Sequence, residues 1–224
     1  MSQPVIVVVG AGPGVGASVA RRYGREGYAA GLVSLPADDL EKLGQQLQSE
    51  GITTGWTPVD VTDHDGLTAA ITRFGGFADG IDVLHFNPSA FRQKHPLDLS
   101  VDELLEDVAL GVGGLLTAVQ AARPFMKAGA RVTATGSMAA DQPWNEAASL
   151  GVQKAALRNL VQSIDTTLKP DGIRAVSVTV RGTLGKGTPF DADYVADALY
   201  AAAHQPEETW RTEVPFTGGP TTGS

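Results

Sequence analysis

The chain has 224 residues, a length that suits one medium-sized α/β domain with a single buried core. It contains no cysteine, which excludes disulfides, thiolate catalysis and cysteine-ligated metals. The formal net charge is −8 without a cluster of Lys and Arg, which argues against a nucleic-acid surface. No apolar run approaches the roughly 20 residues that span a bilayer, and the N-terminus lacks a signal-peptide pattern. These features predict a soluble, cytoplasmic protein that binds neither nucleic acid nor membrane.

Strand-like and helix-like segments alternate along the whole chain. Predicted strands cover residues 5–9, 29–34, 53–59, 81–86, 131–135, 174–180 and 212–216. Predicted helices cover residues 17–25, 38–50, 63–73, 100–126, 147–168 and 193–204. Such alternation implies parallel strands joined by right-handed helical crossovers. We therefore expect an α/β fold of the Rossmann type, a doubly wound parallel sheet of about seven strands in three layers. One domain would cover residues 1–217, followed by a flexible tail at 218–224.

The first strand ends in a glycine-rich turn. The β-branched run Val5-Ile6-Val7-Val8-Val9 is typical of a strand buried on both faces, and the predicted helix begins soon after it. Between them lie four glycines and a valine: Gly10, Gly12, Gly14, Val15 and Gly16. In such a turn the first helical amides bind an anion, and side chains would block a pyrophosphate. The pattern predicts a dinucleotide site, with a tight turn that holds no ligand as the alternative.

The spacing Gly10-x-x-x-Gly14-x-Gly16 resembles the fingerprint of the short-chain dehydrogenase/reductase family, although Val9 replaces the usual threonine. The resemblance continues over nearly the whole chain. It implies an NAD(P)-binding domain in which Asp60 and Val61 lie beside the adenine ring. Asn87, in the element Phe86-Asn87-Pro88-Ser89, matches an asparagine of the family's cofactor site.

The same resemblance extends to the end of the chain that would hold the nicotinamide. Gly136-Ser137 matches the family's catalytic serine, and Arg181-Gly182 matches a Pro-Gly pair whose following residues touch the nicotinamide amide. Gly182 and Leu184 are therefore expected beside the cofactor. NAD-preferring members place an Asp at the end of the second strand, where this chain has Ser34. The absence of that carboxylate favours NADP slightly over NAD, and Ser34 is expected to bond a ribose or phosphate oxygen.

The catalytic residues of the family are only half present. The family's reaction resembles a proton relay in which a tyrosine phenol, four residues before a lysine, exchanges a proton with the substrate oxygen. Here Ser137 and Lys154 are retained, whereas Leu150 stands in place of the tyrosine and Gly111 in place of an asparagine. A leucine has no titratable proton, so the usual relay cannot run. A register shifted by one residue offers only Ser149, a far weaker acid on another helix face.

Several polar residues are candidates for what remains of the site. The family lysine also hydrogen-bonds the nicotinamide ribose, so Lys154 is interpreted mainly as a cofactor-binding residue. Ser137 and Lys154 are the catalytic candidates, and His85 is a third because it ends a strand on the cofactor side. Asp141 and Glu146 lie in a loop that borders the substrate in the family, and would act as acids only if desolvated. The four histidines are scattered, so no metal site is expected.

Three functions fit this pattern. The first is an NAD(P)-dependent oxidoreductase with a changed proton donor, in which Ser137 or a bound water supplies the proton. The second is a non-redox enzyme, such as an isomerase, lyase or cyclase, in the same cleft. The third is a cofactor-sensing protein without turnover. The substrate would be a small molecule that no residue pattern identifies, and the family resemblance implies a homodimer or homotetramer built on the two long helices.

Overall fold

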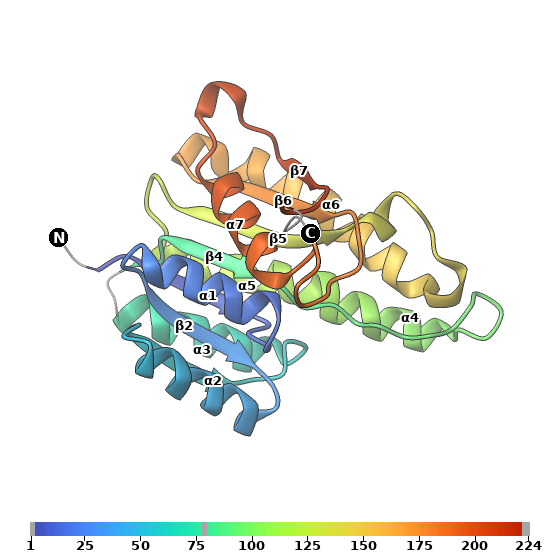
Figure 1. Ribbon diagram of the computed structural model, residues 1–224, viewed down its shortest axis with the longest axis horizontal. Helices are drawn as coiled ribbons and strands as arrows, with labels where there is room; N and C mark the ends of the chain where they lie inside the picture. The colour runs from blue at the N-terminus through green and yellow to red at the C-terminus, as the bar shows by residue number, and fades with distance from the viewer. Residues whose placement is uncertain (1–2, 78–79, 221–224) are drawn as a thin grey trace.

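A seven-stranded, all-parallel sheet forms the centre of the molecule (Figure 1). The computed structural model describes residues 3–77 and 80–220. The strands are β1 Val5–Val9, β2 Ala29–Ser34, β3 Thr54–Pro58, β4 Val83–Phe86, β5 Arg131–Ser137, β6 Arg174–Val180 and β7 Glu213–Phe216. Their order is β3-β2-β1-β4-β5-β6-β7, which confirms the predicted doubly wound sheet. The order reverses between β1 and β4, and in such sheets ligands bind beyond the carboxyl ends of the strands at that point.

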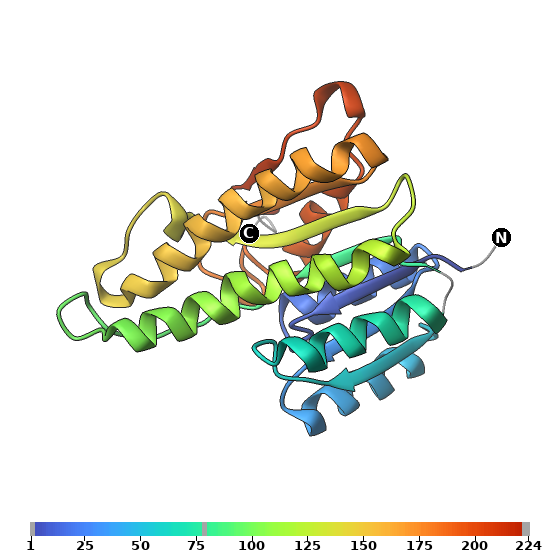
Figure 2. The ribbon, with the colours of Figure 1, turned by 180° about the vertical axis from the view of Figure 1, so that it is seen from behind.

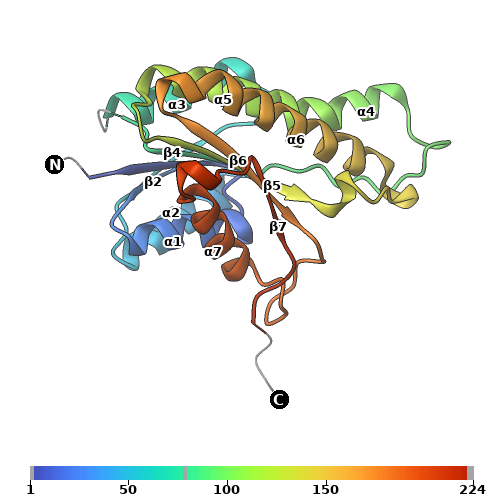
Figure 3. The same ribbon diagram turned by 90° about the horizontal axis from the view of Figure 1, so that it is seen from above.

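Helices cover both faces of the sheet and give the three layers that the sequence predicts (Figures 2 and 3). One face carries α1 Val15–Arg25, α2 Ala37–Ser49 and α7 Ala192–Ala203. The other carries α3 His64–Phe77, α4 Val101–Val108, α5 Gly114–Ala122 and α6 Ala148–Leu168. Two apolar clusters, one on each side, form the core, and each combines inward side chains of the strands with one layer of helices. The α4 end of the second layer and the start of α6 extend beyond the sheet (Figure 3).

The helix predicted over residues 100–126 is interrupted. A π-helical turn over Ala109–Gly113 joins α4 to α5, and a 3₁₀ turn over Arg123–Phe125 follows. A capping box begins α4, with the Glu103 amide donating to Ser100 Oγ over 3.1 Å and the Ser100 amide donating to Glu103 Oε2 over 3.0 Å. Glycines weaken the α-helical preference of the interrupted segment. Sequence periodicity did not reveal the π turn, a feature that often marks functional sites.

The segment Val101–Phe125 is long and apolar enough to cross a membrane by length and composition alone, with a mean hydropathy of 1.4 over its most apolar window. Its second half nevertheless packs inside the domain. Leu115, Ala118 and Ala122 are fully buried in the core cluster that also contains α3 and α6 side chains. This is the environment of a core helix in a globular domain.

Several element ends differ from the prediction. β5 continues to Ser137 because Gly136 and Ser137 still pair with β6, so the serine lies on the last residue of a strand. The helix after the glycine turn begins at Val15 instead of residue 17, and β4 begins at Val83 instead of residue 81. In the predicted tail, residues 218–220 have no regular secondary structure, and the Gly219 amide donates to the Pro189 carbonyl over 2.6 Å. Residues 221–224 lie outside the described residues.

A buried ion pair joins α6 to β6. Arg174 donates from two nitrogens to the two carboxylate oxygens of Asp165, each over 2.9 Å, and the Ala175 amide donates to Asp165 Oδ1 over 2.8 Å. Both charged side chains are 6% exposed. Because the carboxylate satisfies three donors at once, it fixes the end of α6 against the sheet.

Asp165→Ala is expected to lower the free energy of unfolding by about 3 kcal/mol, because it removes the buried bidentate partner of the Arg174 guanidinium and leaves only the exposed Glu207 carboxylate paired with it. Urea unfolding followed by circular dichroism measures the change. Glu208→Ala, which removes an exposed carboxylate, is the control and should change stability by no more than about 0.5 kcal/mol. Equal effects of the two substitutions would contradict this interpretation of the ion pair.

Candidate cofactor and active site

A cavity of about 620 Å³ opens at the carboxyl ends of β1, β4, β5 and β6. It brings together most of the residues predicted from the sequence: Gly10, Gly12, Gly14, Val15, Ser34, Asn87, Ser137, Lys154, Gly182 and Leu184. A second hollow of about 320 Å³ contains Asp60 and Val61 and shares Gly10 and Ser34 with the first, so the two form one groove. The groove crosses the topological switch point of the sheet, where a dinucleotide would lie.

The glycine turn has the conformation and the open space that a pyrophosphate requires. Gly10 has a φ of +81°, and a Cβ there would meet the Pro88 ring at 2.8 Å. A Cβ on Gly16 would lie 2.9 Å from Ala11 Cα, so Gly16 permits close packing of the turn and does not line the cavity. Added Cβ atoms on Gly12 and Gly14 would meet nothing within 4 Å. No side chain caps α1, so its first amides are available to an anion, and these residues fit a dinucleotide phosphate.

Asn87 connects the glycine turn to the neighbouring strands. Its Nδ2 donates to the Gly10 carbonyl over 3.1 Å, its Oδ1 accepts from Thr135 Oγ1 over 2.8 Å, and its backbone amide donates to Val9 over 2.9 Å. These bonds use both ends of the carboxamide. Asn87 therefore lines the cavity, but its side chain holds the glycine turn in shape.

Asp60 stabilises a turn and also lines the second hollow. Its Oδ1 accepts from the amide of Thr62 over 2.9 Å and from the Thr62 hydroxyl over 2.7 Å. These two bonds hold the pKa of the Asp60 carboxyl below its ordinary value, so it stays ionised at neutral pH. Val61 is buried beneath it and packs against Gly114 of α5. Asp60 therefore gives the hollow a charged hydrogen-bond acceptor, and Val61 gives it an apolar surface.

Lys154 is buried in the wall of the cavity. Its side chain donates from Nζ to the carbonyl oxygens of Thr135 over 3.0 Å and Pro88 over 3.3 Å, and the residue is 3% exposed. Both acceptors are neutral, and burial lowers the pKa of Lys154 to about 8. An ammonium has three donors, so one N–H of Lys154 remains after these two bonds. The side chain can therefore reach a ligand in the cavity without leaving its carbonyl partners.

The position expected for a phenol is an apolar part of the same wall. Leu150 and Lys154 both line the cavity from α6, as their four-residue spacing predicts. Ser149, the alternative donor one residue earlier, is fully buried on the side of α6 that faces Asp107, away from the cavity lining. Among the described residues that line this cavity there is no tyrosine. The side chains around Lys154 therefore include no group that could act as the usual phenolic acid.

Ser137 lines the cavity, whereas residues 138–149 that follow it do not. Ser137 Oγ accepts from the Ala139 amide over 3.2 Å, which leaves its own proton free for a ligand. Asp141 pairs with Arg158 over 2.6 Å and with Arg181 over 3.1 Å. The hydrogen bond from Arg158 holds the pKa of the Asp141 carboxyl below its ordinary value, so this residue is not a desolvated acid. Glu146 is exposed in the same loop.

His85 lies inside the sheet instead of at the cavity wall. The side chain is fully buried, and its Nδ1 lies 2.9 Å from Thr133 Oγ1. Burial, with a smaller effect of the Lys154 charge, lowers the pKa of His85 to about 3. A histidine that stays neutral across the physiological range has no proton to give there. The geometry assigns His85 to packing and hydrogen bonding.

Apolar residues form the remaining mouth of the cavity. Leu184 is half exposed on one side, and Phe91 lies on the other with its ring 5.9 Å from that of Trp144. Gly182 lines the cavity, but a Cβ there would overlap the Phe190 ring, so packing of the following loop also requires glycine. Sequence reasoning did not identify Phe91, because a lone aromatic residue in a loop carries no periodic signal.

Sequence reasoning also missed Gln153, which is fully buried beside Lys154. A polar residue on the buried stripe of α6 was the available signal. Within residues 3–77 and 80–220, no three His, Cys, Asp or Glu side chains lie close enough to hold a metal ion.

Comparison with known proteins identifies the family of this chain. The family model for the short chain dehydrogenases matches residues 4–193. A cis-4-hydroxycyclohexanecarboxylate dehydrogenase of Sinomonas cyclohexanicum is 30% identical over 210 residues, covering 92% of this chain and 82% of the relative. An uncharacterized oxidoreductase of Staphylococcus epidermidis is 25% identical and covers 96% of each chain. The chain therefore belongs to the short-chain dehydrogenase family, whose members named here are oxidoreductases.

Solved structures agree with this fold assignment. A dehydrogenase/reductase from Sinorhizobium meliloti superposes with a TM-score of 0.88 at 21% identity, over 98% of this chain and 95% of the other. A short-chain dehydrogenase from Burkholderia cenocepacia, solved in complex with NADP, gives a TM-score of 0.86 at 22% identity, over 96% and 97% of the two chains. At these identities the likeness confirms the architecture.

Gly12→Val is expected to abolish nucleotide binding while leaving the fold intact, because a Cβ on Gly12 would meet no protein atom and would enter the space that the two hollows beside the glycine turn share. Isothermal titration calorimetry with NADP and NAD, beside thermal unfolding, separates the two effects. Gly76→Val, an exposed glycine of α3 with equally open surroundings, is the matched control and should leave binding unchanged. Unaltered nucleotide affinity in Gly12→Val would show that the phosphates bind elsewhere.

Proposed function

We propose that the protein is an NADP(H)-dependent oxidoreductase that interconverts a small alcohol and its carbonyl compound without a phenolic acid. One observation carries the proposal: the glycine turn, Ser137 and Lys154 line one cavity, whereas Leu150 stands where the phenol would be. NADP, when bound, supplies hydride chemistry at its nicotinamide ring. The chain's own residues then orient the reactants and manage one proton.

The proton step is assigned to the polar groups that remain. The Ser137 hydroxyl, or a water beside it, holds the substrate oxygen and passes the proton. The Lys154 ammonium uses its remaining donor on the nicotinamide ribose and places a positive charge near the reacting oxygen. Leu150 excludes water from one side of this site.

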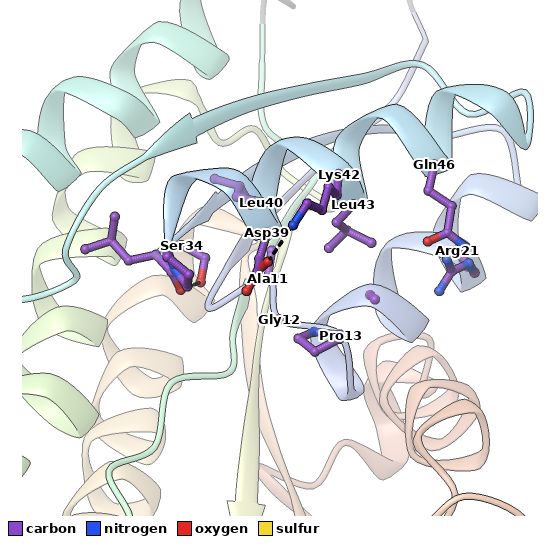
Figure 4. A pocket seen from close by; sticks show the side chains of 13 residues that line it. Ala11, Gly12, Pro13, Arg21, Ser34, Asp39, Leu40, Lys42, Leu43 and Gln46 are labelled. Atoms are coloured by element: carbon purple, nitrogen blue, oxygen red, sulfur yellow. Dashed lines mark hydrogen bonds and ion pairs between the residues drawn. The ribbon is translucent and has the colours of Figure 1, made fainter.

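A hollow of about 370 Å³ between the glycine turn, the end of β2 and α2 supports NADP over NAD (Figure 4). Ser34 lies at its rim, where an Asp would hold the ribose hydroxyls of NAD. Lys42 lies 3.4 Å from Asp39 in this hollow, and both side chains are well exposed, so their pairing is weak and the ammonium is free to turn to a phosphate. Arg21, at the other end, is bound to Glu50 over 2.8 Å. The NADP bound to the Burkholderia relative adds support.

The cavity wall favours a substrate without charge. Lys154 is the only charged residue among the described residues that line it, and two neutral carbonyls already hold its ammonium. Phe91, Leu150 and Leu184 offer apolar contact instead. The name of the Sinomonas relative describes a ring alcohol that also bears a carboxylate. We therefore propose small ring or open-chain alcohols and ketones as the class to test, each with and without a carboxylate.

A homodimer or homotetramer in the cytoplasm completes the proposal. Val101 and Leu105 of α4, Leu116 of α5 and Val152 of α6 are exposed apolar residues on the two long helical segments. Such a surface is suited to helix packing between copies. Sedimentation velocity at micromolar concentration would contradict this assembly by giving the monomer mass of 23.3 kDa.

Lys42→Ala is expected to weaken NADP binding about fivefold, because it removes a charge beside the 2′-phosphate, and to leave NAD binding unchanged. Calorimetric titrations with both nucleotides measure the two affinities. Lys169→Ala removes an exposed lysine beyond the end of α6 and is the control. An equal loss for NADP and NAD, or no loss for either, would remove Lys42 from cofactor selection.

Turnover is expected as a change in NADPH absorbance with at least one member of the alcohol and ketone panel. Ser137→Ala should lower the rate about 100-fold through loss of the group that holds the substrate oxygen. Leu150→Tyr should raise the rate or leave it similar.

The other two functions predict different results in the same assay. Tight NADP binding without turnover across the panel would favour a cofactor-sensing protein. Product that forms while the cofactor spectrum stays constant would favour an isomerase, lyase or cyclase. Binding of neither nucleotide would contradict the proposed function and the sensing alternative together.

A further inference from the structure

A side-chain amide fastens α6 to the loop that follows β4. The Gln153 side chain is fully buried, its Oε1 accepts from the Ala90 amide over 3.0 Å, and its Nε2 donates to the Ala90 carbonyl over 3.0 Å. One residue of the loop thus has both backbone groups paired by a single carboxamide. These backbone groups are partly buried and would lose their partners without the carboxamide, so the bond pair fixes the position of the loop at Ala90.

Gln153 occupies space that a side chain at Gly111 would otherwise take. Gly111 is buried in the π turn between α4 and α5, and a Cβ built on it would overlap Gln153 Oε1 and lie 3.1 Å from Gln153 Cδ. This glycine stands at the place where the family resemblance indicates an asparagine. The missing side chain on the π turn and the long amide on α6 are therefore complementary, and a side chain at residue 111 would displace the end of the Gln153 side chain.

The loop that Gln153 fixes carries contacts of the cofactor cavity. Its Pro88 carbonyl accepts from Lys154, its Pro88 ring packs under Gly10, and its Asn87 side chain bonds the Gly10 carbonyl. Arg92, just beyond, is bound to Asp107 of α4 over 3.1 Å, which secures the far end of the loop. Movement at Ala90 would therefore disturb both the Pro88 carbonyl that binds Lys154 and the glycine turn.

We propose that Gln153 is a positioning residue that replaces the absent Gly111 side chain. It fills the space beside the π turn and holds residues 87–91 so that Lys154 stays buried on the Pro88 carbonyl. The effect on nucleotide affinity rests on the proposed function. The effect on Lys154 itself does not, because it is a property of the protein without a cofactor.

Single substitutions at Gln153 and Gly111 and one double variant test the proposal. Gln153→Met keeps the length of the side chain but leaves the Ala90 amide and carbonyl unpaired, and Gly111→Asn introduces the overlap. Either change should weaken NADP binding about tenfold. Gly111→Asn combined with Gln153→Ala removes the overlap but leaves Ala90 unpaired, so its loss of NADP affinity should match that of Gln153→Ala alone and stay below the sum of the two single losses. Should Gln153→Met fail to fold, Gln153→Glu, which keeps only the acceptor, should give an intermediate loss.

The ionisation of Lys154 provides a readout that a general packing defect would not move. Carbon-13 NMR of lysine-labelled, cofactor-free protein, assigned with Lys154→Met, should show Lys154 titrating near pH 8 in the wild type. In Gln153→Met, water that enters beside Pro88 should raise this pKa by about one unit or more toward the ordinary lysine value. The nearby titratable side chain, His85, stays neutral through this range. Thermal unfolding checks that each variant is folded.

Two results would contradict the role proposed for Gln153. A folded Gln153→Met with unchanged Lys154 titration would overturn the proposal. A double variant whose loss of NADP binding free energy equals the sum of the two single losses would also overturn it. If the wild type bound no NADP, the proposed function would fail, while the Lys154 titration would still decide the role of Gln153.

Discussion

The site depends on how a buried ammonium is held. Lys154 projects from α6 into the cavity wall and is bound by carbonyl oxygens from the end of β5 and from the loop after β4. Burying an unpaired charge is expensive, and here neutral carbonyls offset that cost only in part, which is why the pKa of Lys154 falls to about 8. The surrounding contacts all hold these carbonyls: Asn87 ties the loop to the glycine turn, and Gln153 ties it to α6. The lysine is held in position before any ligand arrives.

This arrangement separates two functions that are usually joined in one site. The side that would bind a dinucleotide retains its glycines, an uncapped helix N-terminus and the lysine. The side that would exchange a proton has Leu150 and Gly111 at the positions where the resemblance to the family indicates a tyrosine and an asparagine. The space beside Gly111 is not empty, because the Gln153 side chain fills it. The two positions that differ from the family therefore have different surroundings. The Gln153 side chain occupies the space beside Gly111, whereas Leu150 forms an apolar part of the cavity wall.

The layers of the fold and the position of the cavity could be predicted because they follow from local patterns. Alternating strand and helix periodicity and the glycine turn after a β-branched run place the carboxyl ends of β1 and β4 at one crevice. The π turn at Ala109–Gly113 could not be predicted, since it depends on how Gly111 packs against α6. Nor did the pattern assign His85 or Asp141, whose strand-end and loop positions were compatible with chemistry. Burial decides against proton transfer for His85, and two arginines decide against it for Asp141. Contacts between residues far apart in the chain carry no periodic signal.

A crystal structure of the protein with NADP bound would show whether the groove holds the cofactor while no phenol lies beside the nicotinamide. We expect the pyrophosphate on the first amides of α1, with the Lys154 ammonium hydrogen-bonded to the nicotinamide ribose. We expect only Ser137 and water beside the reacting carbon. A dinucleotide bound outside the cavity, or one in the cavity with Lys154 turned away from the ribose, would contradict these expectations.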